Sequence, residues 1–85
     1  MEIKILGSGC PKCKTLEANT RQALRELGVE APVIHETDIR KIMAFGVLST
    51  PGLVVNGKLE STGRVLGVGE VKDILSRSHH APEVR

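Results

Sequence analysis

The sequence is almost without aromatic side chains: Phe45 is the only one among 85 residues, and neither Trp nor Tyr occurs. Sequence-tolerant binding of single-stranded nucleic acid relies on bases that stack on aromatic rings and Arg planes. The net charge is only +2, with acidic and basic residues interspersed, so no basic stripe could follow a phosphate backbone. We therefore expect no nucleic-acid partner and a solvated surface of mixed charge.

Long apolar runs are also lacking. None approaches the roughly 18–20 residues that a membrane-spanning helix needs. Residues 1–6 are too short for the apolar region of a signal peptide, and no basic segment precedes them. We therefore expect a cytoplasmic protein without membrane association. A chain of this length builds one core, so we expect a monomeric domain over residues 1–76 and a polar, flexible tail over residues 77–85.

Cysteine is scarce, but its two occurrences are close together: Cys10 and Cys13 are separated by two residues. Two cysteines are too few for the disulfide framework of a small secreted domain, and in a reducing compartment a close pair indicates catalysis or metal binding. The pair follows a short apolar run, 3–6, and precedes a segment with helical periodicity, 16–27. This position places two sulfurs on one exposed helical turn, where a disulfide between them can open and close.

Hydrophobic periodicity predicts alternating strands and helices along the rest of the chain. The first two strands are expected to be parallel through a right-handed crossover, and the last two to form an antiparallel hairpin at Asn56-Gly57. The predicted strands cover residues 3–6, 31–36, 53–55 and 58–65, and the predicted helices cover residues 11–27, 38–45 and 68–75.

The segment Gly9-Cys10-Pro11-Lys12-Cys13-Lys14 resembles the active-site motif of small archaeal and bacterial thioredoxin-like or glutaredoxin-like redox-active disulfide proteins. Residues 37–39 are similar to the start of that family's second helix, and residues 46–57, with Thr50-Pro51 before an apolar strand, to the segment that follows. The resemblance covers residues 1–76. It implies a minimal thioredoxin fold of the α/β class, with a four-stranded mixed sheet in the order 2-1-3-4 flanked by three helices. It also implies a cis peptide bond before Pro51, beside the cysteines.

Two positions differ from the larger thioredoxins that this chain resembles. Those proteins carry a buried acid in the first strand, six residues before the first cysteine, which assists proton transfer. The corresponding residue here is Lys4. They also have a tryptophan directly before that cysteine, where this chain has Gly9.

The chemistry expected at the motif is disulfide exchange, which needs an accessible thiolate and a second thiol to resolve the mixed disulfide. Cys10 is the expected nucleophile, because the start of a helix and the positive charges of Lys12 and Lys14 favour a thiolate there. Cys13, one turn on and on the apolar stripe, is the expected resolving thiol. Lys12 either tunes the thiolate or is only solvated.

Two prolines and a threonine complete the predicted site. Pro11 stiffens the turn between the cysteines. If Thr50 and Pro51 are placed as in the family, they offer a backbone edge to an extended substrate segment, a form of strand addition.

The predicted function is therefore that of a thiol–disulfide oxidoreductase whose partners are protein disulfides. No cofactor is expected besides the Cys10–Cys13 disulfide. No dinucleotide fingerprint is present, so a thioredoxin-reductase-like donor or a small thiol would supply electrons.

Two alternatives stay open. A closed zinc site usually needs four ligands, and only His35, His79 and His80 remain as candidates beside the cysteines, so no metal site is predicted. A dithiol carrier of Cu(I), Hg(II) or arsenite needs only two ligands. A redox-sensing module, in which the disulfide switches a partner surface without turnover, is the second alternative.

Overall fold

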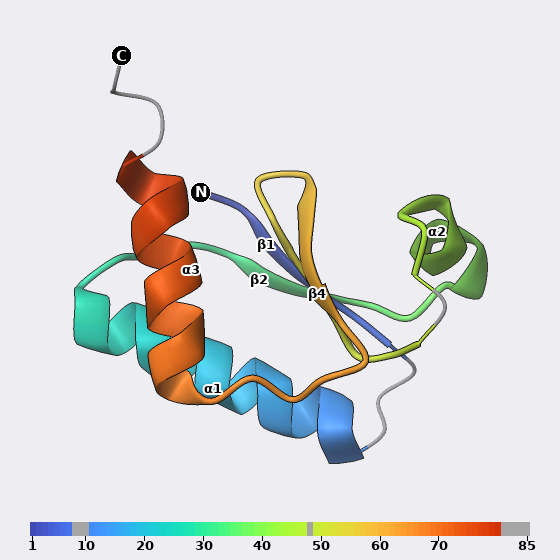
Figure 1. Cartoon of the computed structure of the whole chain (residues 1–85), viewed down its shortest axis with the longest axis horizontal. Coiled ribbons are helices and arrows are strands. Elements are labelled where there is room, and N and C mark those ends of the chain that lie inside the picture. The colour runs from blue at the N-terminus through green and yellow to red at the C-terminus, as the bar shows by residue number, and fades with distance from the viewer. Residues whose placement is uncertain (8–10, 48, 81–85) are drawn as a thin grey trace.

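The computed structural model describes residues 1–7, 11–47 and 49–80 of the chain. The predicted order of strands and helices is confirmed in this range (Figure 1). The elements are β1 (Ile3–Leu6), α1 (Pro11–Leu27), β2 (Val33–Glu36), α2 (Ile39–Ala44), β3 (Gly52–Val55), β4 (Lys58–Thr62) and α3 (Val68–His80).

The four strands form one mixed sheet in the order β2-β1-β3-β4, which confirms the order that the resemblance implied. Strand β1 is parallel to β2 and antiparallel to β3, and β3 and β4 form an antiparallel hairpin. Helices α1 and α3 lie together on one side of the sheet, whereas α2 lies apart from them, beyond the end of β2 (Figure 1). The architecture is therefore α/β, with three helices around a four-stranded sheet.

Apolar side chains fill both faces of the sheet, but unequally. Successive side chains of a strand point to opposite faces, so Ile3 and Ile5 of β1 lie on one face of the sheet and Leu6 lies on the other. Strand β3 is buried at all four residues because both of its faces are covered. The α2 side has a small cluster of Leu6, Ile42, Val47 and Val54. The α1 and α3 side has a larger cluster of Ile3, Ile5, Leu16, Ala23, Leu24, Leu53, Val55, Leu66, Val71, Ile74 and Leu75.

Helix α1 carries the predicted inner stripe, with residues at spacings of three and four facing the sheet. The Thr20 hydroxyl is fully buried on this stripe and donates a hydrogen bond of 2.7 Å to the Leu16 carbonyl, so its burial leaves no polar group unpaired. Gly28 has a φ of +70° and ends the helix, with a 3.0 Å bond from the Val29 N–H to the Leu24 carbonyl. The buried residues of α1 are Cys13, Leu16, Thr20, Ala23 and Leu24.

Three element boundaries differ by two residues or more from those predicted from the sequence. Strand β2 begins at Val33 and not at residue 31, because Pro32 has no N–H to offer a ladder. Strand β4 ends at Thr62 and not at residue 65, because Gly63 turns away with a φ of +73°. Helix α3 continues to His80, past the predicted end at residue 75 and into the predicted tail. No Pro or Gly interrupts residues 76–80.

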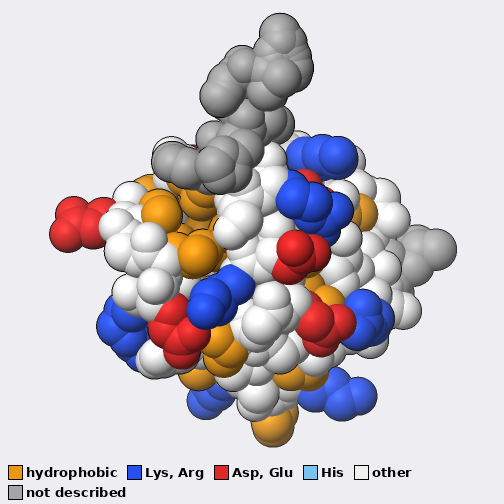
Figure 2. All heavy atoms as spheres, turned by 60° about the vertical axis from the view of Figure 1, so that its left-hand side comes forward, with side chains coloured by type: hydrophobic (Ala, Val, Ile, Leu, Met, Phe, Trp, Pro, Cys, Tyr) orange, Lys and Arg blue, Asp and Glu red, His pale blue; other side chains and the backbone are white. Residues whose placement is uncertain are grey.

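One face of the molecule matches the expected mixture of charges. On the face shown in Figure 2, Lys and Arg side chains are interspersed with Asp and Glu side chains. One pair of this kind, Glu26 and Lys72, joins α1 to α3 at 3.0 Å. A hydrogen bond from Gln22 and then the Lys72 ammonium hold the pKa of Glu26 below its ordinary value. Among the helices that the structure describes, none has the length and apolar character needed to cross a membrane.

Candidate functional site

The first turn of α1 carries most of the predicted motif. Pro11 is exposed and occupies the first helical position, where its missing N–H removes no hydrogen bond. Lys12 and Lys14 are also exposed, and Cys13 between them is fully buried. The predicted nucleophile, Cys10, lies outside the described residues. The described turn therefore presents positive charge outwards and one thiol inwards.

The buried thiol lies against the end of β1. A Cβ atom built on Gly7 would overlap Cys13 Sγ, so the sulfur occupies the space where any other residue would place its side chain. The Cβ atom of Thr50 lies 3.6 Å from the same point. The N–H of Gly7 donates a 3.0 Å hydrogen bond to the Glu36 carbonyl, which extends the pairing of β1 with β2. Three segments thus meet around Cys13 Sγ: the end of β1, the first turn of α1 and the segment that contains Thr50.

The third of these segments contains Thr50 and Pro51. The peptide bond between them is cis, which confirms what the resemblance implied. Thr50 is exposed and Pro51 is buried directly before β3. The Pro51 carbonyl accepts a hydrogen bond of 2.8 Å from the N–H of Gly63, so the end of β4 supports this loop. The structure therefore brings Thr50 and Cys13 to the same end of the sheet.

Lys4 occupies the position at which larger thioredoxins carry a buried acid. Its side chain is half-buried, and Nζ lies 5.7 Å from the centroid of the Phe45 ring, within the range of a cation–π contact. Phe45 caps the end of α2, so Lys4 points to the α2 face of the sheet. Strand β1 contains no Asp or Glu. It therefore supplies no acid for proton transfer to the cysteines.

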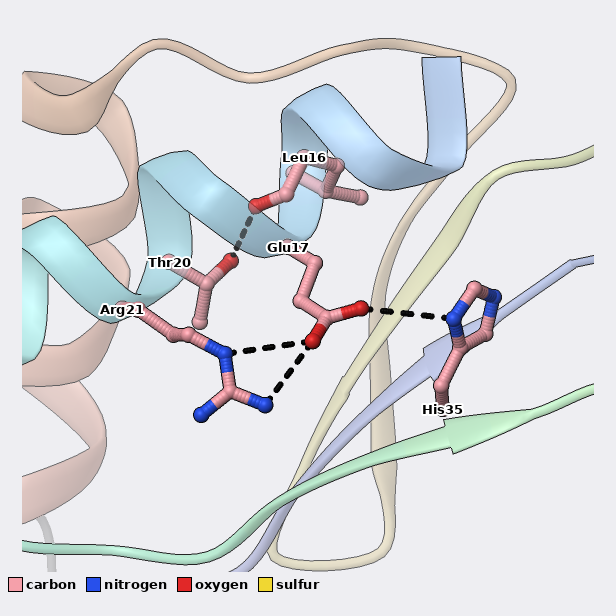
Figure 3. A network of polar contacts seen from close by, with 5 residues as sticks. All are labelled: Leu16, Glu17, Thr20, Arg21 and His35. Carbon is pink, nitrogen blue, oxygen red and sulfur yellow. Dashed lines mark hydrogen bonds and ion pairs between the residues drawn. The ribbon is translucent and has the colours of Figure 1, made fainter. Parts of the chain in front are cut away.

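A polar network between α1 and β2 was not predicted from the sequence (Figure 3). Glu17 Oε2 accepts two hydrogen bonds from Arg21, of 3.1 and 2.8 Å, within α1. Glu17 Oε1 lies 3.3 Å from Nδ1 of His35. The other ring nitrogen, His35 Nε2, is buried and has no hydrogen-bond partner in the described structure. The sequence carries no local signal for this contact, because it depends on how α1 packs on β2.

Metal ligands do not converge in the described part of the chain. There, no three side chains of His, Cys, Asp or Glu are grouped closely enough to hold an ion. His35 meets one carboxylate, that of Glu17. The side chains of His79 and His80, like Cys10, lie outside the described structure, so the expectation of no metal site stays a prediction.

Comparison with known proteins identifies the fold that carries these residues. A family model described as "Thioredoxin domain" matches residues 1–76. This chain belongs to the thioredoxin family. A protein named Thioredoxin from Methanothermobacter thermautotrophicus is 42% identical over 76 residues, a match that covers 89% of this chain and 99% of the relative.

A second relative supports the same assignment. The protein named Thioredoxin from Methanocaldococcus jannaschii is 36% identical over 73 residues, which cover 86% of this chain and 84% of the relative. Thiol–disulfide oxidoreduction is the general activity of the thioredoxin family, and membership assigns that class of activity to this chain. The resemblance read from the sequence motif is thereby confirmed at the level of the family.

Proposed function

We propose that this thioredoxin-family protein exchanges disulfides with protein partners through a dithiol/disulfide pair formed by Cys10 and Cys13. The observation that carries the proposal is the position of Cys13. It lies in the first turn of α1 and faces the end of β1, beside the exposed Thr50. A second cysteine three residues earlier adjoins the start of the same helix, within the usual spacing of a redox-active pair.

Cys10 is the proposed nucleophile because its surroundings favour a thiolate. The first turn of α1 contains no acidic residue and exposes Lys12 and Lys14. The positive end of the helix dipole acts in the same direction. An unperturbed thiol with a pKa of about 8.5 is only about 3% ionised at pH 7, so these charges raise the fraction that reacts.

Cys13 is the proposed resolving thiol because it is fully buried. A bulky substrate disulfide cannot reach it first. The Cys10 thiolate attacks the substrate disulfide, forms a mixed disulfide and releases the first substrate thiolate. Cys13 then attacks Cys10 Sγ, which releases the second substrate thiolate and leaves the Cys10–Cys13 disulfide. Two electrons pass from the protein to the substrate. One proton for the two substrate thiolates comes from Cys13, and the other comes from solvent, which took up the Cys10 proton when the thiolate formed.

The substrate segment is proposed to lie along Thr50 and Pro51, next to Pro11 and Lys12. All of these except Pro51 are exposed, and Thr50 is close to the Cys13 side chain. Main-chain groups next to an apolar strand suit an extended peptide, which adds to the structure as a further strand would. Lys12 contributes positive charge beside the reacting sulfur.

The electron source and the cellular setting are part of the same proposal. The disulfide itself is the redox centre, with no further cofactor. A thioredoxin-reductase-like protein or a small thiol returns it to the dithiol form. We also propose that the protein acts in the cytoplasm as a monomer.

The test is reduction of a protein disulfide with dithiothreitol as the electron source, compared with Cys10→Ser and Cys13→Ser. The expected result is turnover by the unmodified protein and none by either variant. Cys13→Ser is expected to trap a covalent mixed disulfide with substrate, whereas Cys10→Ser is not. Trapping by Cys10→Ser alone would reverse the two roles. Stoichiometric binding of Cu(I) or arsenite without any turnover would favour a dithiol carrier.

A further inference from the structure

The Glu17–His35 contact lies on the side of the sheet where Cys13 is buried. In the pairing of β1 with β2, Ile5 is opposite His35, so both side chains point to the same face. Ile5 belongs to the core cluster under α1, and His35 contacts Glu17 of α1. Gly7 follows Ile5 by two residues and therefore presents the same face, where Cys13 Sγ occupies its missing side-chain position.

The spacing of strands brings His35 within reach of this point. Neighbouring strands are about 4.8 Å apart and rise about 3.3 Å per residue, so the Cα atoms of His35 and Gly7 are about 8 Å apart. For proton exchange, the imidazole of one residue and the sulfur that lies against the other must come within hydrogen-bond distance or be joined by one water.

The chemistry of the ring supports a role as a base. The Glu17 carboxylate, 3.3 Å from Nδ1, favours the tautomer with its proton on Nδ1, which leaves Nε2 as an acceptor. Nε2 is buried and unpaired in the described structure, and a buried acceptor without a donor is unfavourable. In Figure 3 it lies on the side of the ring away from Glu17.

Few charged groups among the residues that the structure describes face the imidazole. Helix α1 presents Glu17 and Arg21, which pair with each other. Strand β1 presents the apolar Ile5 on this face, whereas Lys4 points to the other side of the sheet. A carboxylate that orients an imidazole, with the second nitrogen left as an acceptor, is the arrangement that activates nucleophiles in many enzymes.

From this arrangement we propose that His35, oriented by Glu17, accepts the proton of Cys13 as that thiol resolves the mixed disulfide. The inference rests on the proposed roles of Cys10 and Cys13. The S–H bond of Cys13 breaks as its proton moves to Nε2, and the Cys13 sulfur bonds to Cys10 Sγ as the substrate thiolate leaves. The imidazolium, stabilised by Glu17, then gives its proton to that thiolate or to solvent. His35 thus supplies the proton acceptor that β1, with Lys4 in place of an acid, does not.

The two attacks can be measured separately in a stopped-flow spectrophotometer. The reduced protein is mixed in excess with 5,5′-dithiobis(2-nitrobenzoate), and the release of coloured thiolate is followed over time. Attack by Cys10 releases one coloured thiolate, and attack by Cys13 on the mixed disulfide releases the second. His35→Gln is expected to leave the first release unchanged and to slow the second about 10²-fold at neutral pH, at the lower end of what general bases contribute. Raising the pH until the Cys13 thiol loses its proton to solvent without the help of His35 is expected to restore the rate of the second release.

A second substitution keeps the test valid if His35→Gln does not fold. Glu17→Gln retains the ring and removes the carboxylate that orients it, and it is expected to slow the second release selectively. The control is Lys72→Gln, which breaks the 3.0 Å contact of α1 with α3 and loosens the same helix at a site far from the cysteines in sequence. It is expected to leave both releases unchanged.

Each remaining outcome has one meaning. If His35→Gln slows both releases equally, or slows the second without recovery at high pH, the residue is structural and the inference is wrong. The same conclusion follows if the second release is as fast as in the unmodified protein. If the unmodified protein releases no coloured thiolate at all, the proposed function fails, independently of His35.

Discussion

Replacing Gly7 by Ala tests whether the position of Cys13 Sγ, the proposed resolving thiol, depends on the absence of a side chain at residue 7. The new Cβ would overlap Cys13 Sγ, whereas Cys13 Cβ and Thr50 Cβ, at 3.5 and 3.6 Å, are at ordinary contact distances. The sulfur is fully buried in the first turn of α1, so relief requires a change of the Cys13 χ1 rotamer inside the core, or movement of that turn or of the end of β1. Overpacking of this kind costs about 1–3 kcal/mol of unfolding free energy.

The substitution is expected to affect the chemistry as well as the fold. A displacement of about 1 Å in a reacting group can cost about 10² in rate, so release of the second thiolate in the two-step assay should slow. Urea unfolding gives the change in stability, and the stopped-flow trace gives the change in rate. Both measurements use the same protein preparation.

A double-substitution cycle identifies the cause. Cys13→Ala keeps the Cβ atom, which is at an ordinary distance, and removes the sulfur that overlaps. Gly7→Ala should therefore cost close to nothing in the Cys13→Ala background. Gly69→Ala is the matched control: no atom lies within 4 Å of the point that its new Cβ would occupy, and it should stabilise α3 by about 0.5–1 kcal/mol. An equal loss from Gly7→Ala with and without the Cys13 sulfur would refute the steric explanation.

Two further expectations concern stability. Leu16 is completely buried on the inner face of α1, so Leu16→Ala should lower the unfolding free energy by about 2–5 kcal/mol in urea titrations, and a loss below about 1 kcal/mol would contradict its place in the core. The N–H of Gly67 and then the Arg64 guanidinium hold the pKa of Glu70 below its ordinary value. Its contribution to stability is therefore present above the unfolded-state pKa and is lost as the pH falls through the lower folded-state pKa. Urea midpoints measured across that acidic range should fall less steeply for Glu70→Gln than for the unmodified protein, and identical slopes would contradict this assignment.

Local signals in the sequence were sufficient to predict the helices and the hairpin, but the expectation of two sulfurs on an exposed turn is wrong for Cys13, which is fully buried. A spacing of three and four residues places Cys13 and Leu16 on one face of α1, and both are fully buried. Asn56 and Gly57 adopt φ values of +53° and +81°, as the hairpin turn between β3 and β4 requires.

Contacts between elements could not be predicted in the same way. The approach of Cys13 to Gly7 and the contact of Glu17 with His35 depend on the angle and height at which α1 crosses the sheet. Hydrophobic periodicity identifies which face of α1 is buried, but it does not determine that angle or the β2 residue below each turn. The strand order and the cis bond before Pro51 came from the family resemblance, because about 5–6% of X-Pro bonds in folded proteins are cis and the sequence alone favours trans.

The unequal covering of the two sheet faces has a consequence for how this scaffold can be altered. Most of the buried apolar side chains belong to the α1 and α3 side, while the six-residue helix α2 closes the other side with a few contacts. Exchanges in α2 at residues other than the buried Ile42 therefore remove little of the burial that holds the fold together. The chain segment from α2 leads directly to Thr50. If substrates dock along Thr50 as proposed, an engineer can change which substrates bind by redesigning the α2 side and leave the larger core intact.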